Sequence, residues 1–283
     1  MTQLTWLVTG CSSGFGEKFI LDILSRRDKA IATSRGPVSR IQKLKDVGAS
    51  TYSLDITAPK TEVDAVMSLI IQENGGIDVL VNNAGYVENG IFEEVSCETI
   101  LAQYETNVFG SIKATQALLP HFRQKRSGTV VFIGSMGGWY GVPSGVPYVS
   151  SKFALEGFHE CLSASVAHLG IKSIIFEPGF FRTQVFHPDN TKYQPSDIGD
   201  YDALRAETTQ FLQGIQGSQT GDPKKGIKVM IDVVKGEGVA AGKAMPERMP
   251  VGADALGAIR KKCEDTLAIC KEWEEVITST DFE

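Results

Sequence analysis

Short apolar runs alternate with longer stretches of helical spacing along the first two thirds of the chain. Six runs have the length and composition of buried strands: residues 4–9, 30–33, 50–54, 78–81, 129–133 and 172–176. Helical patterns cover 17–27, 62–73, 98–125 with an expected interruption at Pro120, and a stretch that begins near residue 148. Apolar strands that alternate with helices predict a parallel sheet covered by helices on both faces.

The next part of the chain is less regular. Residues 187–201 are polar with two prolines and predict a mobile loop above the carboxyl edge of the sheet. Helices are expected at 202–215 and 222–235. An edge strand is expected at 245–252, although two prolines weaken that prediction.

Beyond residue 252 the pattern becomes amphipathic. Apolar side chains recur at helical spacing: Leu256, Ile259, Cys263, Leu267, Cys270, Trp273 and Ile277. This spacing predicts a helix that packs one face onto another part of the structure. Covering the sheet edge, closing the active site and contacting another subunit are three alternatives, and simple structural packing is the interpretation we favour.

Length and composition support one soluble α/β domain. A chain of 283 residues with 42% hydrophobic and 22% charged residues can bury a substantial core. We expect residues 1–252 to form a Rossmann-type doubly wound domain of about seven strands. Residues 253–283 would be a C-terminal helical extension of the same domain.

Charge and cysteine content exclude several classes of protein. The net charge of -6 argues against a nucleic-acid partner, and no apolar run approaches the ~18 residues that span a bilayer. Because an apolar strand pattern begins at residue 4, we expect no secretory signal. Five scattered cysteines without Cys-x-x-Cys spacing suit reduced thiols, and the four histidines show no zinc motif. We therefore expect a cytoplasmic protein without a metal.

A glycine-rich turn separates the first strand from the first helix. Residues 10–16 read Gly-Cys-Ser-Ser-Gly-Phe-Gly, so backbone N–H groups and the helix N-terminus can bind a phosphate. Gly10-x-Ser12-x-Gly14 also matches the nucleophile elbow of serine hydrolases. A hydrolase needs an earlier strand and loop for its oxyanion hole, whereas this turn follows the first strand. Labelling of Ser12 by a serine-reactive probe would support the hydrolase alternative.

Tyr148 and Lys152 suggest proton transfer. They are four residues apart, so a helix places both side chains on one face. A free tyrosine has a pKa near ~10, and a lysine one turn away favours the phenolate and lowers that pKa. Ser135 follows the strand at 129–133 and can hold a substrate oxygen beside the tyrosine.

Together these features resemble the short-chain dehydrogenase/reductase family. The resemblance is carried in order by Thr9-Gly10-x-x-x-Gly14-x-Gly16, Asn82-Asn83-Ala84-Gly85, Asn107, Ser135, Tyr148-x-x-x-Lys152 and Pro178-Gly179 with Thr183. It spans roughly residues 4–183. It implies interconversion of a carbonyl and an alcohol, with Asn107, Ser135, Tyr148 and Lys152 as catalytic residues. Asn107 would hold a water against Lys152.

The same resemblance implies a bound nicotinamide cofactor. Its binding residues would be Thr9, Gly10, Ser12, Ser13, Gly14, Phe15, Gly16, Ser34, Arg35, Asp55, Ile56, Asn83, Ala84, Gly85, Asn107, Tyr148, Lys152, Pro178, Gly179, Phe181 and Thr183. Asp55 would meet the adenine, Asn82 would tie adjacent strands together, and Thr183 would bind the carboxamide. In a dinucleotide fold an acid after the second strand favours NAD, whereas an arginine accommodates the 2′-phosphate of NADP. Ser34 and Arg35 occupy that position, so we predict NADP(H).

The substrate is expected to be a hydrophobic small molecule. Apolar side chains near the expected pocket are Trp139, Val142, Phe180, Val185 and Phe186. The resemblance places a substrate lobe at about residues 184–235. Arg40, Lys43 and Lys45 are interpreted as a solvated helix face. The alternative function is a non-catalytic NADP-binding sensor or scaffold, and a homo-oligomer is left open.

Overall fold

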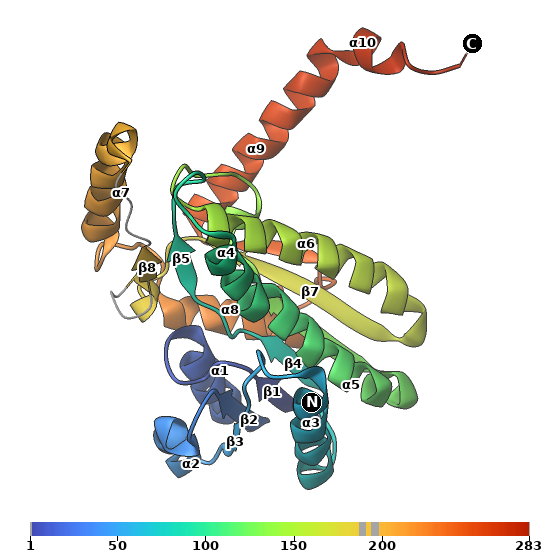
Figure 1. The fold of residues 1–283 in the computed structure, drawn as a ribbon. Coiled ribbons are helices and arrows are strands. Elements are labelled where there is room, and N and C mark those ends of the chain that lie inside the picture. The colour runs from blue at the N-terminus through green and yellow to red at the C-terminus, as the bar shows by residue number, and fades with distance from the viewer. Residues whose placement is uncertain (1, 187–190, 194–197, 283) are drawn as a thin grey trace.

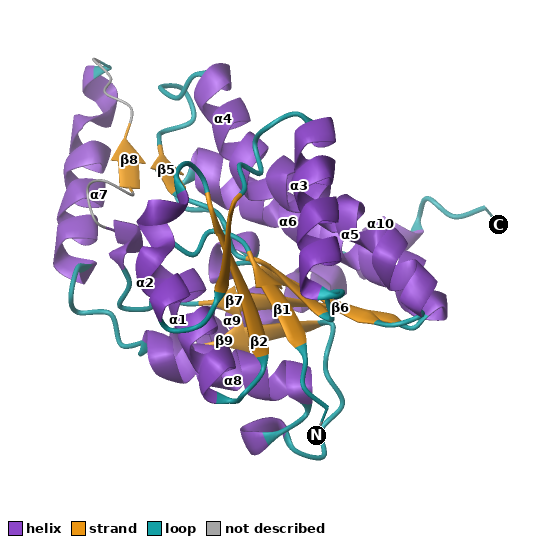
Figure 2. Ribbon diagram, turned by 90° about the horizontal axis from the view of Figure 1, so that it is seen from below, coloured by secondary structure: helices purple, strands orange, loops and turns teal. Residues whose placement is uncertain are grey.

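The computed structural model of the protein describes residues 2–186, 191–193 and 198–282. Seven of the described strands form one sheet, in the order β3-β2-β1-β4-β6-β7-β9, with every neighbouring pair parallel (Figures 1 and 2). They are β1 (Thr5–Val8), β2 (Lys29–Ser34), β3 (Ser50–Ser53), β4 (Val79–Asn82), β6 (Gly128–Ile133), β7 (Ile171–Pro178) and β9 (Arg248–Val251). The predicted doubly wound sheet is confirmed.

Helices cover both faces of this sheet (Figure 2). They are α1 (Gly14–Ser25), α2 (Gln42–Asp46), α3 (Lys60–Asn74), α4 (Cys97–Tyr104), α5 (Ser111–Lys125), α6 (Val146–Val166), α7 (Asp202–Ile215), α8 (Pro223–Lys235), α9 (Ala253–Glu272) and α10 (Glu274–Thr278). Alternate strand residues feed two separate cores: Trp6 and Val8 pack with α1 and α8, and Leu7 packs with α3, α5 and α6. Both faces of β1 are therefore apolar.

Residues 98–125 differ from the prediction in where their irregularity lies. Pro120 is inside a continuous α5, held by the buried Leu118 and Phe122 on either side. A wider π-helical turn, Glu105–Gly110, instead joins α4 to α5. Such turns insert one extra residue into a helix and are frequent at functional sites. The expected interruption at Pro120 is therefore wrong, and the distortion lies at Asn107.

The edge strand and the polar loop had different outcomes. β9 is the edge strand of the sheet and pairs with β7 on one side only. Because no further strand lies beyond it, Pro250 removes no hydrogen bond to such a strand. Within the predicted loop at 187–201, Thr191–Tyr193 forms β8 and pairs in parallel with β5 (Val87–Asn89). Residues 187–190 and 194–197 lie outside the described part of the chain.

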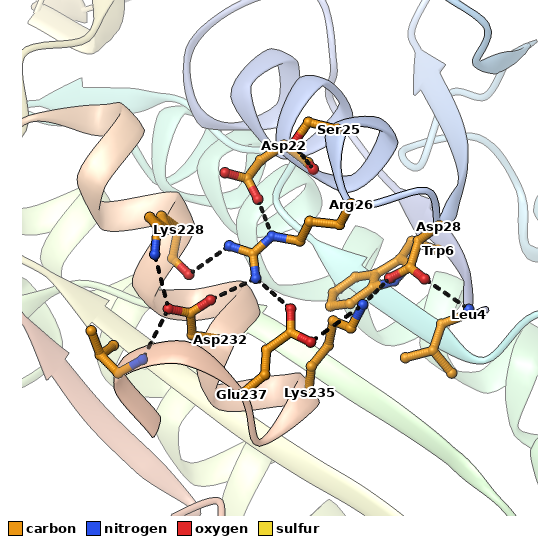
Figure 3. Close-up of polar contacts among 11 residues, drawn as sticks. Leu4, Trp6, Asp22, Ser25, Arg26, Asp28, Lys228, Asp232, Lys235 and Glu237 are labelled. Carbon is orange, nitrogen blue, oxygen red and sulfur yellow. Dashed lines mark hydrogen bonds and ion pairs between the residues drawn. The ribbon is translucent and has the colours of Figure 1, made fainter. Parts of the chain in front are cut away.

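A buried group of ion pairs joins α1 to α8 (Figure 3). The Arg26 guanidinium contacts Asp232 Oδ1 at 2.5 Å and Glu237 Oε1 at 2.7 Å. Burial acts to raise the pKa of Asp232, but Arg26, the Val239 N–H and Lys228 together outweigh it and hold that pKa below its usual value. Beside it, Asp28 accepts from the Lys235 ammonium at 2.8 Å and from the Trp6 indole at 3.1 Å. The helix after the glycine-rich turn is therefore fixed by residues near the other end of the chain.

The C-terminal helix packs only through its first turns. Ala255 and Ile259 are buried, but every described residue from 260 to 282 is exposed, including Leu267 at 69% and Trp273 at 53%. Figure 1 shows α9 leaving the body of the molecule. The amphipathic pattern predicted the helix correctly. Within this chain only the first turns of that apolar face are covered, because the helix extends beyond the sheet, and a contact with another subunit stays a prediction.

Two truncations should therefore behave differently. Ending the chain after Arg260 should leave the melting temperature nearly unchanged, because it removes only exposed residues. Ending it after Gly252 removes Ala255 and Ile259 and should cost about 3 kcal/mol or more of unfolding free energy. Thermal denaturation followed by circular dichroism compares the two. An equal loss of stability in both would contradict this assignment of the packing.

Candidate functional site

One large cavity lies at the carboxyl ends of the strands. Its volume is about 1110 Å³, and it extends from the glycine-rich turn to Ser135, Tyr148 and Lys152. Open α/β sheets bind ligands at this edge. Most of the predicted cofactor residues line it: Gly10, Ser12, Ser13, Gly14, Phe15, Ser34, Arg35, Asp55, Ile56, Asn83, Ala84, Gly85, Asn107, Tyr148, Lys152, Pro178, Gly179, Phe181 and Thr183.

The glycines allow close backbone approach at the turn. Gly10 has φ +71°, and a methyl group there would lie 2.7 Å from Ala84 Cα. A methyl group at Gly16 would lie 2.4 Å from the Gly10 carbonyl oxygen. Gly16 itself does not line the cavity; it brings α1 against the turn. The Ser13 side chain makes no capping hydrogen bond to α1, so it leaves the N–H groups of the first turn to an anion.

Thr9 and Asn83 join the ends of β1 and β4. Thr9 Oγ1 accepts from Asn83 N at 3.0 Å and Ala84 N at 3.1 Å, and it lies behind the cavity wall. Asn83 Nδ2 donates to Thr9 O and Gly10 O at 2.8 and 3.0 Å. Asn82 instead donates to Thr115 on α5. The strand-tying role expected of Asn82 is therefore wrong, because side chains alternate along β4 and Asn83 faces the turn.

Ser135, Tyr148 and Lys152 converge from two elements. Ser135 follows β6, and its hydroxyl accepts from Gly137 N at 3.0 Å. α6 begins at Val146, and its first turns carry Tyr148 and Lys152. The Lys152 ammonium donates to the Ile133 carbonyl at 2.7 Å and lies 5.7 Å from the centre of the Tyr148 ring. The three side chains predicted from spacing thus lie together.

Burial dominates the acidity of this group. It raises the pKa of Tyr148, while the neighbouring Ser135 hydroxyl acts in the opposite direction. It lowers the pKa of Lys152 to about 8, against the charge of Glu156. In this structure the pKa of Tyr148 is raised, not lowered as the spacing predicted, because the phenolate is desolvated and the Lys152 ammonium is hydrogen-bonded to Ile133.

Asn107 lies in the π-helical turn and faces the same cavity. Its side chain donates to Tyr86 O at 3.1 Å and to Ser151 Oγ at 3.3 Å, and accepts from Tyr86 N at 3.2 Å. Ser151 stands directly before Lys152 on α6. Asn107 thus links the turn after β4 to α6, while its role in holding a water stays a prediction.

The opposite end of the cavity is polar and positively charged. Arg35 and Arg40 both line it, and Arg40 Nη1 donates to the Arg35 carbonyl at 3.0 Å. The buried Ser34 hydroxyl has no partner among the described residues. Asp55 is engaged locally, where it accepts from Thr57 N at 2.9 Å. Arg40 is exposed, as the interpretation of a solvated face expects, and it also lines this end of the cavity.

The aromatic residues divide between the cavity and the core. Phe180 and Val185 line the cavity, as does Val142, which is 42% exposed. Trp139 does not: its indole lies 5.0 Å from the Arg248 guanidinium, on the other side of the loop. The prediction of Trp139 as a substrate contact is therefore wrong. The side chain of Phe186 lies outside the described part of the structure.

Helix α7 forms one wall of the cavity. The spacing of its residues did not predict this contact. Leu204, Glu207, Thr208, Phe211 and Leu212 line the cavity from it. The Phe180 and Phe211 rings meet edge to face at 5.9 Å. The apolar spacing of 202–215 predicted the helix. The resemblance, not the spacing, placed residues 202–215 within an expected substrate lobe.

The structure gives no support to the other reaction classes. No histidine is among the described residues that line the cavity, so Ser12 has no imidazole base within the site. The described residues contain no group of three or more side chains suited to a metal ion. No helix in the described part of the chain has the length and apolarity needed to cross a bilayer.

The sequence also matches known proteins. Residues 5–194 match the family model described as short chain dehydrogenase. The chain is 32% identical over 279 residues to Oxidoreductase BOA17 of Botryotinia fuckeliana, covering 98% of each. It is 38% identical over 178 residues to 3-ketodihydrosphingosine reductase of Bacteroides thetaiotaomicron, covering 62% of this chain and 64% of that one. The protein therefore belongs to the short-chain dehydrogenase family of oxidoreductases.

Solved structures agree with this assignment. A short-chain dehydrogenase from Streptomyces avermitilis superposes with a TM-score of 0.88 at 34% identity, over 99% of both chains. The structure of ElxO with NADP bound superposes with a TM-score of 0.71 at 22% identity, over 90% of this chain and all of that one. The second likeness concerns the fold alone.

Proposed function

We propose that the protein is an NADP(H)-dependent enzyme that interconverts a carbonyl and an alcohol on a hydrophobic small molecule. The observation that carries this proposal is the continuous cavity. It joins the glycine-rich turn and Arg35 to Ser135, Tyr148 and Lys152. The glycine contacts, the uncapped start of α1 and the unpartnered Ser34 hydroxyl all suit a dinucleotide with an additional phosphate.

Each catalytic side chain has a distinct task. NADPH, when bound along this cavity, would supply the hydride that reduces the carbonyl carbon. Tyr148 donates its phenolic proton to the oxygen, and its raised pKa keeps it protonated and ready to donate. The Ser135 hydroxyl hydrogen-bonds the same oxygen as negative charge develops. Lys152 stabilises the tyrosinate that remains, and Asn107 holds the water that returns the proton.

The shape of the cavity supports an apolar substrate. Val142, Phe180 and Val185 face α7, whose Leu204 and Phe211 complete an apolar wall. One relative is named 3-ketodihydrosphingosine reductase, which is consistent with reduction of a ketone. We further propose that 1–252 is the dinucleotide-binding and catalytic domain, with 184–235 as its substrate lobe and 253–283 as a helical extension, in a cytoplasmic protein.

Nicotinamide absorbance tests this function directly. Purified protein is mixed with a panel of aryl, alkyl and long-chain ketones and aldehydes, with NADPH and NADH in parallel. We expect NADPH to be consumed faster than NADH with at least one hydrophobic carbonyl. Tight NADPH binding without turnover across the panel would instead favour the non-catalytic sensor or scaffold.

A further inference from the structure

A group of buried polar side chains lies behind Lys152, outside the cavity. Among the described residues, eleven buried side-chain nitrogen and oxygen atoms have no hydrogen-bond partner. Eight of these belong to Trp139, Glu156, His159, Ser173 and Glu177. Buried polar atoms in native proteins normally have a protein or water partner, and these side chains gather around one another, with Glu177 beside both Trp139 and Glu156. A metal does not account for them, because the described residues form no metal-binding cluster.

Glu156 is placed directly against the catalytic elements. It follows Lys152 by four residues on α6, and both side chains are buried. Its carboxyl occupies space left by two glycines that flank Ser135 and its turn. A methyl group at Gly134 would lie 2.9 Å from Glu156 Oε1, and one at Gly138 would lie 3.1 Å from Glu156 Cγ. Glu156 is therefore in contact with the backbone that presents Ser135.

Glu177 approaches from β7 and is completely buried. Each of the two carboxyls influences the acidity of the other, and Arg248 on β9 acts on both. Arg248 Nη2 is 3.8 Å from Glu156 Oε2, and the guanidinium covers the Trp139 ring. The groups facing the carboxyl pair are thus Lys152 from α6, Arg248 from β9 and the Trp139 indole from the loop after Ser135.

Two buried carboxyl groups in one site oppose each other's ionisation, although Lys152 and Arg248 bring two positive charges to it. Burial, and then the charge of Glu177, raises the pKa of Glu156 to about 8. Burial also raises the pKa of Glu177. His159, one turn further along α6, is neutral because burial, and then Arg248, lowers its pKa to about 4. At neutral pH the pair therefore retains one proton, as two carboxyl groups in one site commonly do.

We propose that Glu156 and Glu177 share one proton where α6 packs against β7, and that this pair is a positioning element that keeps Lys152 charged. When the shared proton leaves in mild alkali, a second negative charge appears beside the ammonium. Burial favours loss of the proton from Lys152, and the new negative charge opposes that loss. The enzyme then retains its catalytic lysine as a cation to higher pH than burial alone would allow. This part rests on the proposed role of Lys152 in carbonyl reduction.

Infrared spectroscopy tests the shared proton without any turnover. We expect the intact protein at pH 7 to show a protonated-carboxyl band that disappears as the pH is raised through roughly 8 to 9. The band should be absent at pH 7 in Glu156→Gln and in Glu177→Gln, because a single remaining acid beside Arg248 ionises. It should persist in Glu160→Gln. No such band in the intact protein would overturn the proposal.

The pH profile tests the effect on Lys152. Glu156→Gln imitates the protonated acid, so turnover near pH 6 should stay close to that of the unaltered enzyme. The alkaline limb should move to lower pH by about one unit, because the opposing charge no longer forms. Glu177→Gln removes the repulsion that adds to burial at Glu156 and leaves Glu156 able to ionise, so its alkaline limb should not move down. A purely structural role would lower turnover in both variants at every pH.

Glu160→Gln is the matched control, since Glu160 lies one turn beyond Glu156, also pairs with Arg248 and is 61% exposed on its side chain. Its profile should equal that of the unaltered enzyme. If the infrared band is present but Glu156→Gln and Glu177→Gln shift in the same direction, the tuning of Lys152 is overturned. If no carbonyl is reduced at all, the proposed function fails while the infrared result still decides the shared proton.

Discussion

Replacing Tyr148 with phenylalanine should lower carbonyl reduction by about 10³-fold while NADPH binding is little changed. The variant removes one oxygen atom from a ring that is otherwise held by α6. Ser135 remains at the end of β6, and the Lys152 ammonium keeps its bond to the Ile133 carbonyl. Loss of activity can then be assigned to the missing proton donor. Single-wavelength NADPH oxidation gives the rate, and nicotinamide fluorescence gives the binding.

Tyr140→Phe provides the matched comparison. Tyr140 also lines the cavity, and burial raises its pKa as it does that of Tyr148. It lies on the loop before α6 and is not one turn from the lysine. Its hydroxyl should therefore be dispensable for proton transfer. If Tyr148→Phe retained substantial turnover while Tyr140→Phe lost it, the proton donor would have to be reassigned to Tyr140.

Replacing Arg35 with aspartate should reverse the cofactor preference, raising the ratio of NADH to NADPH efficiency by about 10²-fold or more. Arg35 lines the end of the cavity beside the unpartnered Ser34 hydroxyl. An arginine there can form charge-assisted hydrogen bonds with a 2′-phosphate. An aspartate would repel that phosphate and accept hydrogen bonds from a free ribose hydroxyl. The measurement is kcat/KM with each cofactor and one carbonyl.

Lys43→Asp is the control for this second prediction. Lys43 is also basic and close in sequence, but it pairs with Glu17 at 2.9 Å and does not line the cavity. The same change of charge at that position should leave the preference unaltered. An unchanged preference in Arg35→Asp would remove Arg35 from phosphate recognition. Arg40, which donates to the Arg35 carbonyl, would then be tested in the same way.

The local sequence pattern was sufficient to predict the strands of the main sheet and the helix that carries Tyr148 and Lys152. Apolar runs placed six of the seven main strands, and the spacing of Tyr148 and Lys152 placed two side chains on one face of α6. These predictions succeed because period and turn chemistry are properties of short segments. The cavity-facing position of Ser135 followed as well, since every parallel strand delivers its carboxyl end to the same edge.

Features that depend on distant parts of the chain were not predictable in the same way. Asn82 and Asn83 are identical residues in sequence, and only the pleat of β4 decides which one reaches β1. Trp139 appeared to be a pocket residue, but Arg248, more than a hundred positions later, covers its ring. The exposed face of α9 carries the same apolar spacing as a buried one. Spacing specifies an amphipathic helix, but it cannot show whether a partner surface exists.

The ion pairs at Arg26 also determine when the molecule can be completed during synthesis. The bonds from Arg26 to Asp232 and Glu237 span 206 and 211 residues, and the Asp28 bond to Lys235 spans 207. At bacterial or eukaryotic elongation rates the first of these partners leaves the ribosome roughly 10 to 40 s after Arg26. Until then, Arg26 at the end of α1 lacks the carboxylates of Asp232 and Glu237, and the apolar face of α1 lacks the cover of α8. The glycine-rich turn is thus translated early but is fixed in place late. In a chain that ends before residue 223, neither α8 nor its charges would be there to hold the helix that follows this turn.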